Sequence, residues 1–180
     1  MEETTVLLVI ASEGFQHIEY GVTKQILQDA GFTVMTASDK SGIATAKNGS
    51  TTHVDITLDH IMVNNYAGIF FIGGPGALEC LDNSTSYKIL QEAFYQHKPL
   101  GAICIATRIL AKSGVLRDKY ATGWNEDGLL DALYAEYRVV YLPEEKVVVE
   151  SNTITATDPS AAEQFGKKIV ELLQAKQSWG

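Results

Sequence analysis

The sequence is poor in cysteine, in clustered positive charge and in long apolar runs. Only two of its 180 residues are cysteine, too few for a disulfide framework, which favours a compartment where thiols stay reduced and hence a cytoplasmic location. Fourteen basic residues against 22 scattered acidic ones give a net charge of -8. Because phosphate groups are bound by clustered Lys and Arg, this charge argues against nucleic acid or an anionic membrane as a partner.

Two further absences limit the class of protein. The apolar run at residues 6–11 is too short to span a membrane or to form the apolar part of a signal peptide, and the residues before it include no Lys or Arg. The histidines at positions 53, 60 and 97 show no metal-ligand spacing, so no metal site is expected, and nothing in the sequence calls for a cofactor. No repeat, low-complexity segment or linker is visible, and the length suits one domain over residues 1–180.

Short apolar segments alternate with amphipathic ones along the chain. The β-branched run at residues 5–11 is typical of a central parallel strand covered on both faces. Further strands are expected at residues 32–37, 66–72, 100–103 and 138–141, with hairpins within 38–56 and 146–156. Helices are expected at residues 17–30, 78–96 (with a break near 83–85), 105–113, 127–137 and 160–175. This alternation predicts an α/β fold, a mostly parallel sheet between helical layers, with ligands bound at the carboxyl ends of the strands.

The helix at residues 17–30 shows the expected periodicity most clearly. It follows a loop predicted at residues 12–16 and ends before Gly31. Its apolar residues fall on one stripe, which predicts that this stripe faces the core. The stripe consists of Ile18, Val22, Ile26 and Leu27.

One cysteine stands at a sharp change of pattern. Cys104 follows the strand at residues 100–103, and the apolar spacing after it becomes that of a short helix ended by Gly114. This is the arrangement of a nucleophile elbow, which lifts a side chain above the sheet. The start of a helix favours a thiolate, so the pKa of Cys104 is expected to lie below its usual value. The alternative is a buried, inert thiol, a common state of free cysteine.

Three strand ends are expected to meet at one edge of the sheet. The loop after the first strand brings Glu13 and Glu19, and the strand at residues 66–72 runs into the sequence Gly-Gly-Pro-Gly at 73–76. Taken singly, the glycine run has the alternative of a plain tight turn, and an acid in the first turn of a helix is favoured by the dipole alone. Together with Cys104 they form an acid, a cradle of backbone amides and a thiol, the parts of a catalytic site.

Five segments in this order and spacing resemble the DJ-1/PfpI superfamily, which has a class I glutamine amidotransferase-like fold. These segments are residues 15–19, 71–76, 98–104, 113–116 and 155–165. The resemblance covers nearly the whole chain. It implies a flavodoxin-like three-layer α/β/α sandwich, a homodimer and a small-molecule substrate.

The resemblance also implies roles for particular residues. Cys104 would be the reactive nucleophile, Glu19 a protonated carboxyl beside its sulfur, and Gly74 and Ile105 would present backbone amides to it. The substrate pocket would include Pro75, Gly76, Trp124, Asn125 and Asp158, with Glu126 beside them. From the residues alone, Trp124 could equally be a packed rim residue, and Asp158 an N-cap of the last helix.

Two departures from the family pattern narrow the expected activity. PfpI-type proteases carry a histidine directly after the cysteine, where this chain has Ile105, and relatives with glyoxalase activity often carry a histidine in the loop that here reads residues 121–126 without one. We therefore expect a glyoxalase- or deglycase-like action on reactive aldehydes, with Cys104 as nucleophile and Glu19 as proton shuttle. A PfpI-type peptidase or amidase, or an isonitrile hydratase, is disfavoured. The alternative from another class is a redox sensor or stress chaperone that uses oxidation of Cys104.

Arg108 could bind a carboxylate near the elbow or lie on the helix surface.

Overall fold

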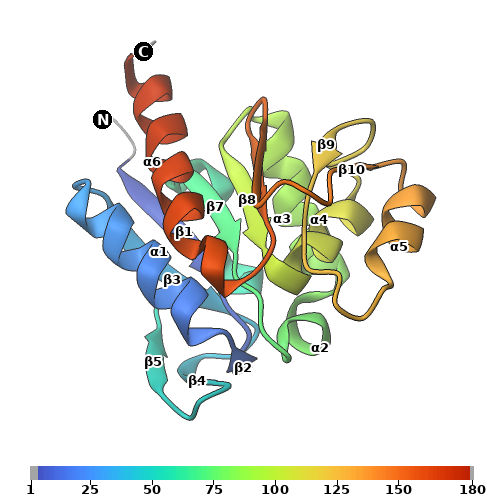
Figure 1. Ribbon diagram of the computed structural model, residues 1–180. Coiled ribbons are helices and arrows are strands. Elements are labelled where there is room, and N and C mark those ends of the chain that lie inside the picture. The colour runs from blue at the N-terminus through green and yellow to red at the C-terminus, as the bar shows by residue number, and fades with distance from the viewer. Residues whose placement is uncertain (1–3, 179–180) are drawn as a thin grey trace.

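A seven-stranded sheet forms the centre of the molecule (Figure 1). The structure, a computed structural model, describes residues 4–178; residues 1–3 and 179–180, the two ends of the predicted domain, lie outside it. The strand order is β11-β12-β8-β7-β1-β3-β6, and every neighbouring pair is parallel except β11 and β12. The strands are β1 (Thr5–Val9), β3 (Thr33–Ser38), β6 (Ile56–Thr57), β7 (Gly68–Phe71), β8 (Leu100–Ile103), β11 (Val147–Glu150) and β12 (Thr153–Ala156).

Helices cover both faces of this sheet. The helices α1 (His17–Asp29) and α6 (Ala162–Ser178) lie on the face turned to the viewer in Figure 1. The opposite face carries α3 (Ser84–Tyr95) and α4 (Thr107–Ser113), with α2 (Ala77–Leu81) and α5 (Leu130–Glu136) beside them. The predicted mixed α/β fold, a mostly parallel sheet in a three-layer flavodoxin-like sandwich, is confirmed.

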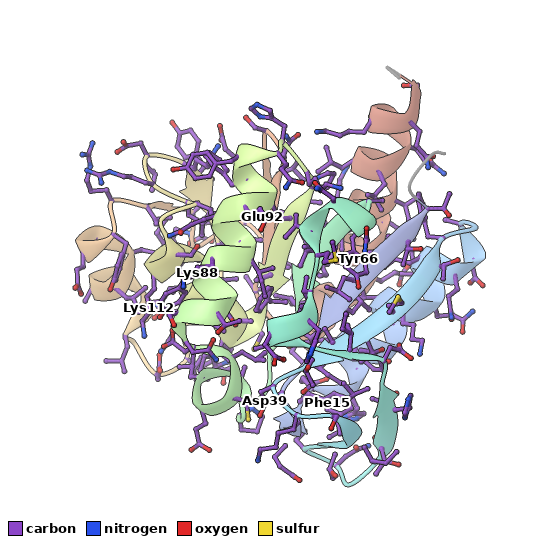
Figure 2. All side chains as sticks on the ribbon, turned by 180° about the vertical axis from the view of Figure 1, so that it is seen from behind. Phe15, Asp39, Tyr66, Lys88, Glu92 and Lys112 are labelled. Carbon is purple, nitrogen blue, oxygen red and sulfur yellow. The ribbon has the colours of Figure 1, made fainter. Side chains whose placement is uncertain are left out.

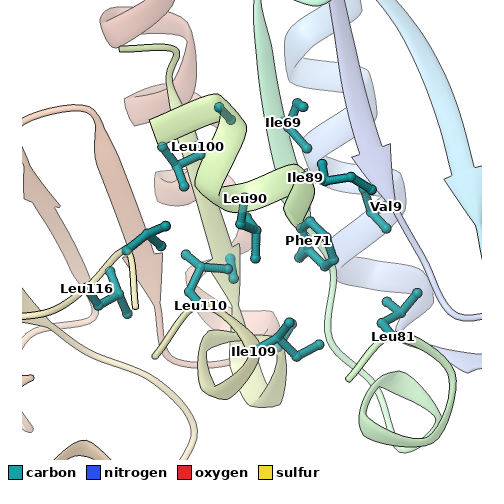
Figure 3. Packing of buried hydrophobic residues seen from close by; sticks show 14 of the residues in the cluster. Val9, Ile69, Phe71, Leu81, Ile89, Leu90, Leu100, Ile109, Leu110 and Leu116 are labelled. Carbon is teal, nitrogen blue, oxygen red and sulfur yellow. The ribbon is translucent and has the colours of Figure 1, made fainter. Parts of the chain in front are cut away.

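The central strands are apolar throughout because each of their faces meets a helical layer. On β1, Leu7 and Val9 belong to the core under α3 and α4, whereas Val6 and Leu8 belong to the core under α1 and α6. Successive side chains of a strand point to opposite faces, so a strand buried on both sides needs a continuous apolar run. Figure 3 shows the first of these cores, where Leu90 of α3 and Leu110 of α4 pack over the sheet.

Smaller elements surround the main sheet. A second sheet in the order β2-β4-β5 is built from β2 (Glu13–Phe15), β4 (Gly42–Ala46) and β5 (Thr51–Val54). A parallel pair joins β9 (Tyr120–Ala121) to β10 (Val140–Tyr141). Short 3-10 turns are η1 (Leu58–His60), η2 (Val63–Asn65), η3 (Cys104–Ala106) and η4 (Pro159–Ala161). Both predicted hairpins are present, β4–β5 and β11–β12.

Several predicted boundaries and one predicted face are wrong. The loop predicted at residues 12–16 contains β2, and the strand predicted at 138–141 pairs with β9 instead of joining the main sheet. The predicted break in the second helical segment separates α2 from α3, with Asn83 capping α3. In α1 the expected buried stripe holds at Leu27, which is fully buried, but fails at Ile18, which is 43% exposed, because the helix turns Glu19 and Thr23 inward instead.

The segment between β1 and α1, the helix that carries Glu19, is tied to the sheet by hydrogen bonds. Ser12 donates from its backbone N–H to Asp39 Oδ1 at 2.8 Å and from Oγ to Asp39 Oδ2 at 2.9 Å. Asp39 follows the end of β3 and is labelled in Figure 2, which shows the molecule from behind. The chain leaving β1 is therefore held over the carboxyl end of β3 before it enters α1.

Gly101 lies where the strands β8 and β12 of the main sheet are closely packed. A Cβ at this position in β8 would lie 2.2 Å from the carbonyl oxygen of Ile154 in β12. We expect Gly101→Ala to lower the free energy of unfolding by about 2–3 kcal/mol, the usual cost of overpacking. Gly21→Ala is the matched control, because a Cβ there meets nothing within 4 Å. In the middle of α1 it should stabilise by about 0.5–1 kcal/mol. Urea unfolding of both variants shows whether each substitution lowers or raises the free energy of unfolding. Equal changes in the two variants would contradict the packing argument.

Candidate functional site

Three chain segments meet at the carboxyl ends of neighbouring parallel strands. The chain after β1 leads through β2 to Glu19, the chain after β7 forms residues 73–76, and Cys104 directly follows β8. Their proximity is measured at Gly73, where a Cβ would lie 2.8 Å from Glu19 Oε2 and 2.6 Å from the Cβ of Cys104. The structure thus brings together the acid, the glycine run and the thiol that the sequence pointed to.

Cys104 has an unusual backbone conformation. Its φ angle is +62°, in the left-handed region that a side chain with a Cβ adopts only at an energetic cost. The residue lies at the turn from β8 into η3, and its carbonyl oxygen accepts a hydrogen bond from Thr107 Oγ1 at 3.0 Å. Cys104 is only 9% exposed. This backbone conformation positions one sulfur atom above the sheet edge, as in a nucleophile elbow.

Glu19 is fully buried beside this thiol. Gln16 caps α1, and its Oε1 accepts the backbone N–H of Glu19 at 3.1 Å, which fixes the first turn of the helix. Glu19 Oε2 accepts the backbone N–H of Gly73 at 2.9 Å. Oε1 is buried without a well-aligned hydrogen-bond partner among residues 4–178, and the carboxyl interacts with the side chain of Cys104. One carboxyl oxygen is therefore anchored, while the group as a whole remains available to the sulfur.

Burial controls the protonation of both groups. Burial raises the pKa of Glu19 to about 7, despite opposing hydrogen bonds from Cys104 and Gly73. The pKa of the Cys104 thiol is also raised, first by burial and then by the negative charge of Glu19. The expected low pKa of Cys104 is therefore wrong. It relied on a helix dipole, but only the short turn η3 starts at Cys104, and the backbone N–H of Ile105 does not offset the loss of solvation.

The two groups titrate as a pair. Since an ionised Glu19 disfavours an ionised Cys104, the pair gives up one proton near neutral pH and resists losing the second. The remaining proton lies mainly on sulfur, because the pKa of Cys104 is far above that of Glu19, and its transfer to the Glu19 carboxylate gives the minor form in which the charge lies on sulfur. In that form a neutral acid donates to a thiolate, and the Ile105 N–H stabilises the same atom.

The glycine run allows two backbone segments to approach each other. Gly74 has a φ angle of +123°, and a Cβ there would lie 2.4 Å from the carbonyl oxygen of Gly14 and 2.6 Å from the backbone nitrogen of Gln16. Only glycine fits this position. The run is therefore a close-packing element between β7 and the β2 segment, and it forms one wall of the site.

A pocket of about 590 Å³ opens above Cys104. Its lining consists of Gln16, Lys47, Gly74, Pro75, Cys104, Ile105, Trp124, Glu126, Asp158, Pro159 and Ser160. Of the residues predicted to form the substrate pocket, Gly76 and Asn125 are not in this lining, and the predicted catalytic acid Glu19 is buried below it. Gly76 precedes α2, and its N–H bonds to the carbonyl oxygen of Gly14, whereas Asn125 directs its side chain to α5, bonding Leu130 N–H and Asp131.

Four lining residues were not anticipated from the sequence: Gln16, Lys47, Pro159 and Ser160. Lys47 reaches the pocket because β2 pairs with β4, and its N–H donates to the carbonyl oxygen of Phe15 at 2.9 Å. No local pattern indicates that pairing. Ser160 follows Asp158 by two residues, and its backbone N–H donates to Asp158 Oδ1 at 2.8 Å. Asp158 thus lines the pocket and caps η4 at the same time.

Arg108 fixes the wall of the pocket that contains Trp124. Its side chain, 5% exposed, donates from Nη2 to Asp127 Oδ1 at 2.7 Å and to the carbonyl oxygen of Trp124 at 3.3 Å. The guanidinium carbon lies 5.5 Å from the centre of the Trp124 ring, a cation–π distance. Arg108 therefore does bind a carboxylate, that of Asp127 in the chain itself, and the alternative that it lies on the helix surface is wrong.

Other kinds of site find no support in the described chain. No group of three or more His, Cys, Asp or Glu within residues 4–178 is arranged to hold a metal ion. None of the helices over the same residues is both long and apolar enough to cross a membrane.

The family model described as the DJ-1/PfpI family matches residues 4–172. A deglycase of Pyrococcus abyssi is 25% identical over 170 residues, which cover 93% of this chain and 99% of the relative. The glutathione-independent glyoxalase DJR-1.2 of Caenorhabditis elegans is 23% identical, with 97% and 91% covered. A ThiJ/PfpI domain protein from Brachyspira murdochii has a similar crystal structure, with a TM-score of 0.91, 23% identity, and 97% of this chain and 99% of that chain covered.

The raised pKa of Glu19 predicts a particular dependence of stability on pH. Between 4.5, the unperturbed value, and about 7, the folded protein keeps a proton that the unfolded chain releases. The free energy of unfolding should therefore fall as pH rises through this window, by about 3 kcal/mol in total. In Glu19→Gln, which keeps the shape and the acceptor for Gly73, this fall should disappear. Denaturant unfolding at about pH 5 and about pH 8 measures it.

Glu126→Gln is the matched control, because Glu126 is an exposed carboxylate at the rim of the same pocket. It should keep the fall seen in the wild type. An equal dependence on pH in wild type and Glu19→Gln would contradict the protonation assigned to Glu19.

Proposed function

This chain belongs to the DJ-1/PfpI family, and from that premise we propose that it is a cysteine-dependent enzyme of the glyoxalase or deglycase type, acting on small reactive aldehydes. The observation that carries the proposal is the buried Glu19 carboxyl beside the strained Cys104, at the base of an open pocket. The two groups together supply a nucleophile and a proton carrier that changes its charge near neutral pH. The names of the deglycase and glyoxalase relatives support the same class of substrate.

The first step is addition to the carbonyl group. The thiolate of Cys104 adds to the aldehyde carbon of a 2-oxoaldehyde such as methylglyoxal, and the proton of Glu19 passes to the oxygen, giving a hemithioacetal. Gly74 and Ile105 line the pocket, which supports a role for their backbone amides in stabilising the developing negative charge on that oxygen.

The second step moves a proton between neighbouring carbons. The carboxylate of Glu19 removes the proton from the carbon bound to sulfur, and an enediolate forms. Return of this proton to the adjacent carbon, with transfer of the hydroxyl proton from the first oxygen to the second, gives a thioester of a 2-hydroxy acid. Water then hydrolyses the thioester and releases the hydroxy acid and the Cys104 thiol. The net reaction adds one water to the dicarbonyl, so it needs no external oxidant or reductant.

The same geometry is poorly suited to peptide cleavage. An amine leaving group must be protonated while the thiolate stays activated, and this usually requires a base next to the nucleophile. Ile105 follows Cys104 directly, and no histidine is among the described residues that line the pocket. Proton transfer falls to Glu19 and solvent alone, so we expect slow dicarbonyl turnover, about 10²-fold below a site with a helper histidine.

The test compares the two cysteines of the chain. Cys104→Ser should abolish formation of lactate from methylglyoxal, whereas Cys80→Ser should retain the wild-type rate, because Cys80 lies outside the pocket lining. Measuring the hydroxy acid, and not only the loss of dicarbonyl, separates turnover from simple scavenging by thiols.

Each other outcome points to a different activity. Lactate formation at the uncatalysed rate by both wild type and Cys104→Ser would overturn the proposal and favour the hypothesis of a redox sensor or stress chaperone, and faster but equal formation by both would overturn the role of Cys104. Cleavage of peptide substrates that depends on Cys104 would overturn the argument from Ile105.

A further inference from the structure

The pocket above Cys104 contains charged side chains of both signs. Asp158 and Glu126 are acidic, and Lys47 is the single basic residue in the lining formed by the described chain. Glu19 lies below them and is partly ionised at neutral pH. The charge surrounding the nucleophile is therefore negative overall.

Asp158 is the carboxylate of this set that acts most directly on the reacting groups. Its charge is felt by both Cys104 and Glu19, whereas that of Lys47 is felt by Glu19. Glu126 is exposed at the rim. Asp158 and Cys104 line the same pocket, so a substrate bound there is exposed to the charge of Asp158.

Asp158 is also fixed in place. Its Oδ1 accepts the backbone N–H of Ser160 at 2.8 Å, at the start of η4. Burial would raise the pKa of Asp158, but hydrogen bonds from Ser160 and Thr157 outweigh it, so the pKa lies below its usual range. The charge of Lys146 also lowers this pKa, and Lys146 donates to Ser160 Oγ at 3.3 Å. Asp158 is thus a permanent, oriented negative charge beside the nucleophile.

We propose that Asp158 is a specificity-determining residue, which selects neutral or positively charged carbonyl compounds and rejects those that carry a carboxylate or a phosphate. This deepens the proposed function, since it assumes that Cys104 is the nucleophile. Rejection arises because a negative substituent next to the reacting carbon meets the Asp158 carboxylate in a partly desolvated pocket, where charges interact more strongly than in water. Lys47 acts in the opposite sense from the other wall.

Two alkylating reagents test this without any turnover. Iodoacetamide and iodoacetate have nearly the same size and react in the same way: the Cys104 sulfur forms a bond to carbon, the carbon–iodine bond breaks, and iodide leaves. They differ in one negative charge. The ratio of their rate constants cancels changes in the thiolate population, which affect both reagents equally. Measurements use a Cys80→Ser background, and a blocked cysteine amide in solution gives the reference ratio.

The expected ratio of iodoacetamide to iodoacetate rates is about fivefold above the reference in the wild type at low ionic strength. Asp158→Asn should bring it close to the reference, while the asparagine preserves the cap of η4. Lys47→Gln should raise it further. Added salt, from about 20 mM to about 500 mM, should reduce the ratio in the wild type.

Glu163→Gln is the control variant, because it removes the same charge at a distance from the pocket, where Glu163 pairs with Lys167 on the exposed side of α6.

The outcomes separate this proposal from the proposed function. An Asp158→Asn ratio equal to that of the wild type, with circular dichroism showing a folded variant, would overturn the role of Asp158. If Glu163→Gln lowered the ratio as much as Asp158→Asn, the role of Asp158 would also be overturned. A charge-dependent ratio without lactate formation from methylglyoxal would leave the role of Asp158 intact and refute the enzyme. A Cys104 inert to both reagents would refute both.

Discussion

The burial of one carboxyl group is the constraint on which the site depends. Glu19 points inward from the first turn of α1, although the apolar periodicity of that helix would place other residues there. A buried carboxylate without partners would cost several kcal/mol, so the group is held by the N–H of Gly73 and keeps its proton up to about pH 7. Ile18 on the same helix is exposed because the helix is oriented with Glu19 toward the interior.

The strain at Cys104 and the glycine run are consistent with the same requirement. A sulfur atom reaches the carboxyl only because Cys104 adopts a left-handed backbone conformation, and the carboxyl has room only because residue 73 has no Cβ. The buried carboxyl of Glu19 and the left-handed backbone of Cys104 thus both cost free energy, and the two apolar cores on the faces of the sheet offset that cost. Such clustering of local cost is typical of functional sites.

Features encoded locally could be predicted from the sequence, and features that depend on distant pairing could not. The strand at residues 100–103 and the elbow at Cys104 follow from apolar spacing over a dozen residues, and both are present. Lys47 lines the pocket only because β2 pairs with β4, which no periodicity indicates. The pKa of Cys104 was predicted with the wrong sign because burial is a property of the tertiary fold, whereas the position of a residue at a helix start is visible in the sequence.

Two carboxyl groups near one sulfur have opposite states because their surroundings differ. Glu19 is enclosed by apolar strands and receives one backbone hydrogen bond, so loss of solvation dominates and it keeps its proton until about neutral pH. Asp158 sits at the start of η4, where hydrogen bonds from Ser160 and Thr157 favour its ionised form. A group that exchanges a proton with sulfur must titrate near the working pH, whereas a group that sorts ligands by charge must not titrate there. Burial of Glu19 meets the first requirement, and the position of Asp158 as the cap of η4 meets the second. The same chemical group, a carboxyl, therefore serves both purposes.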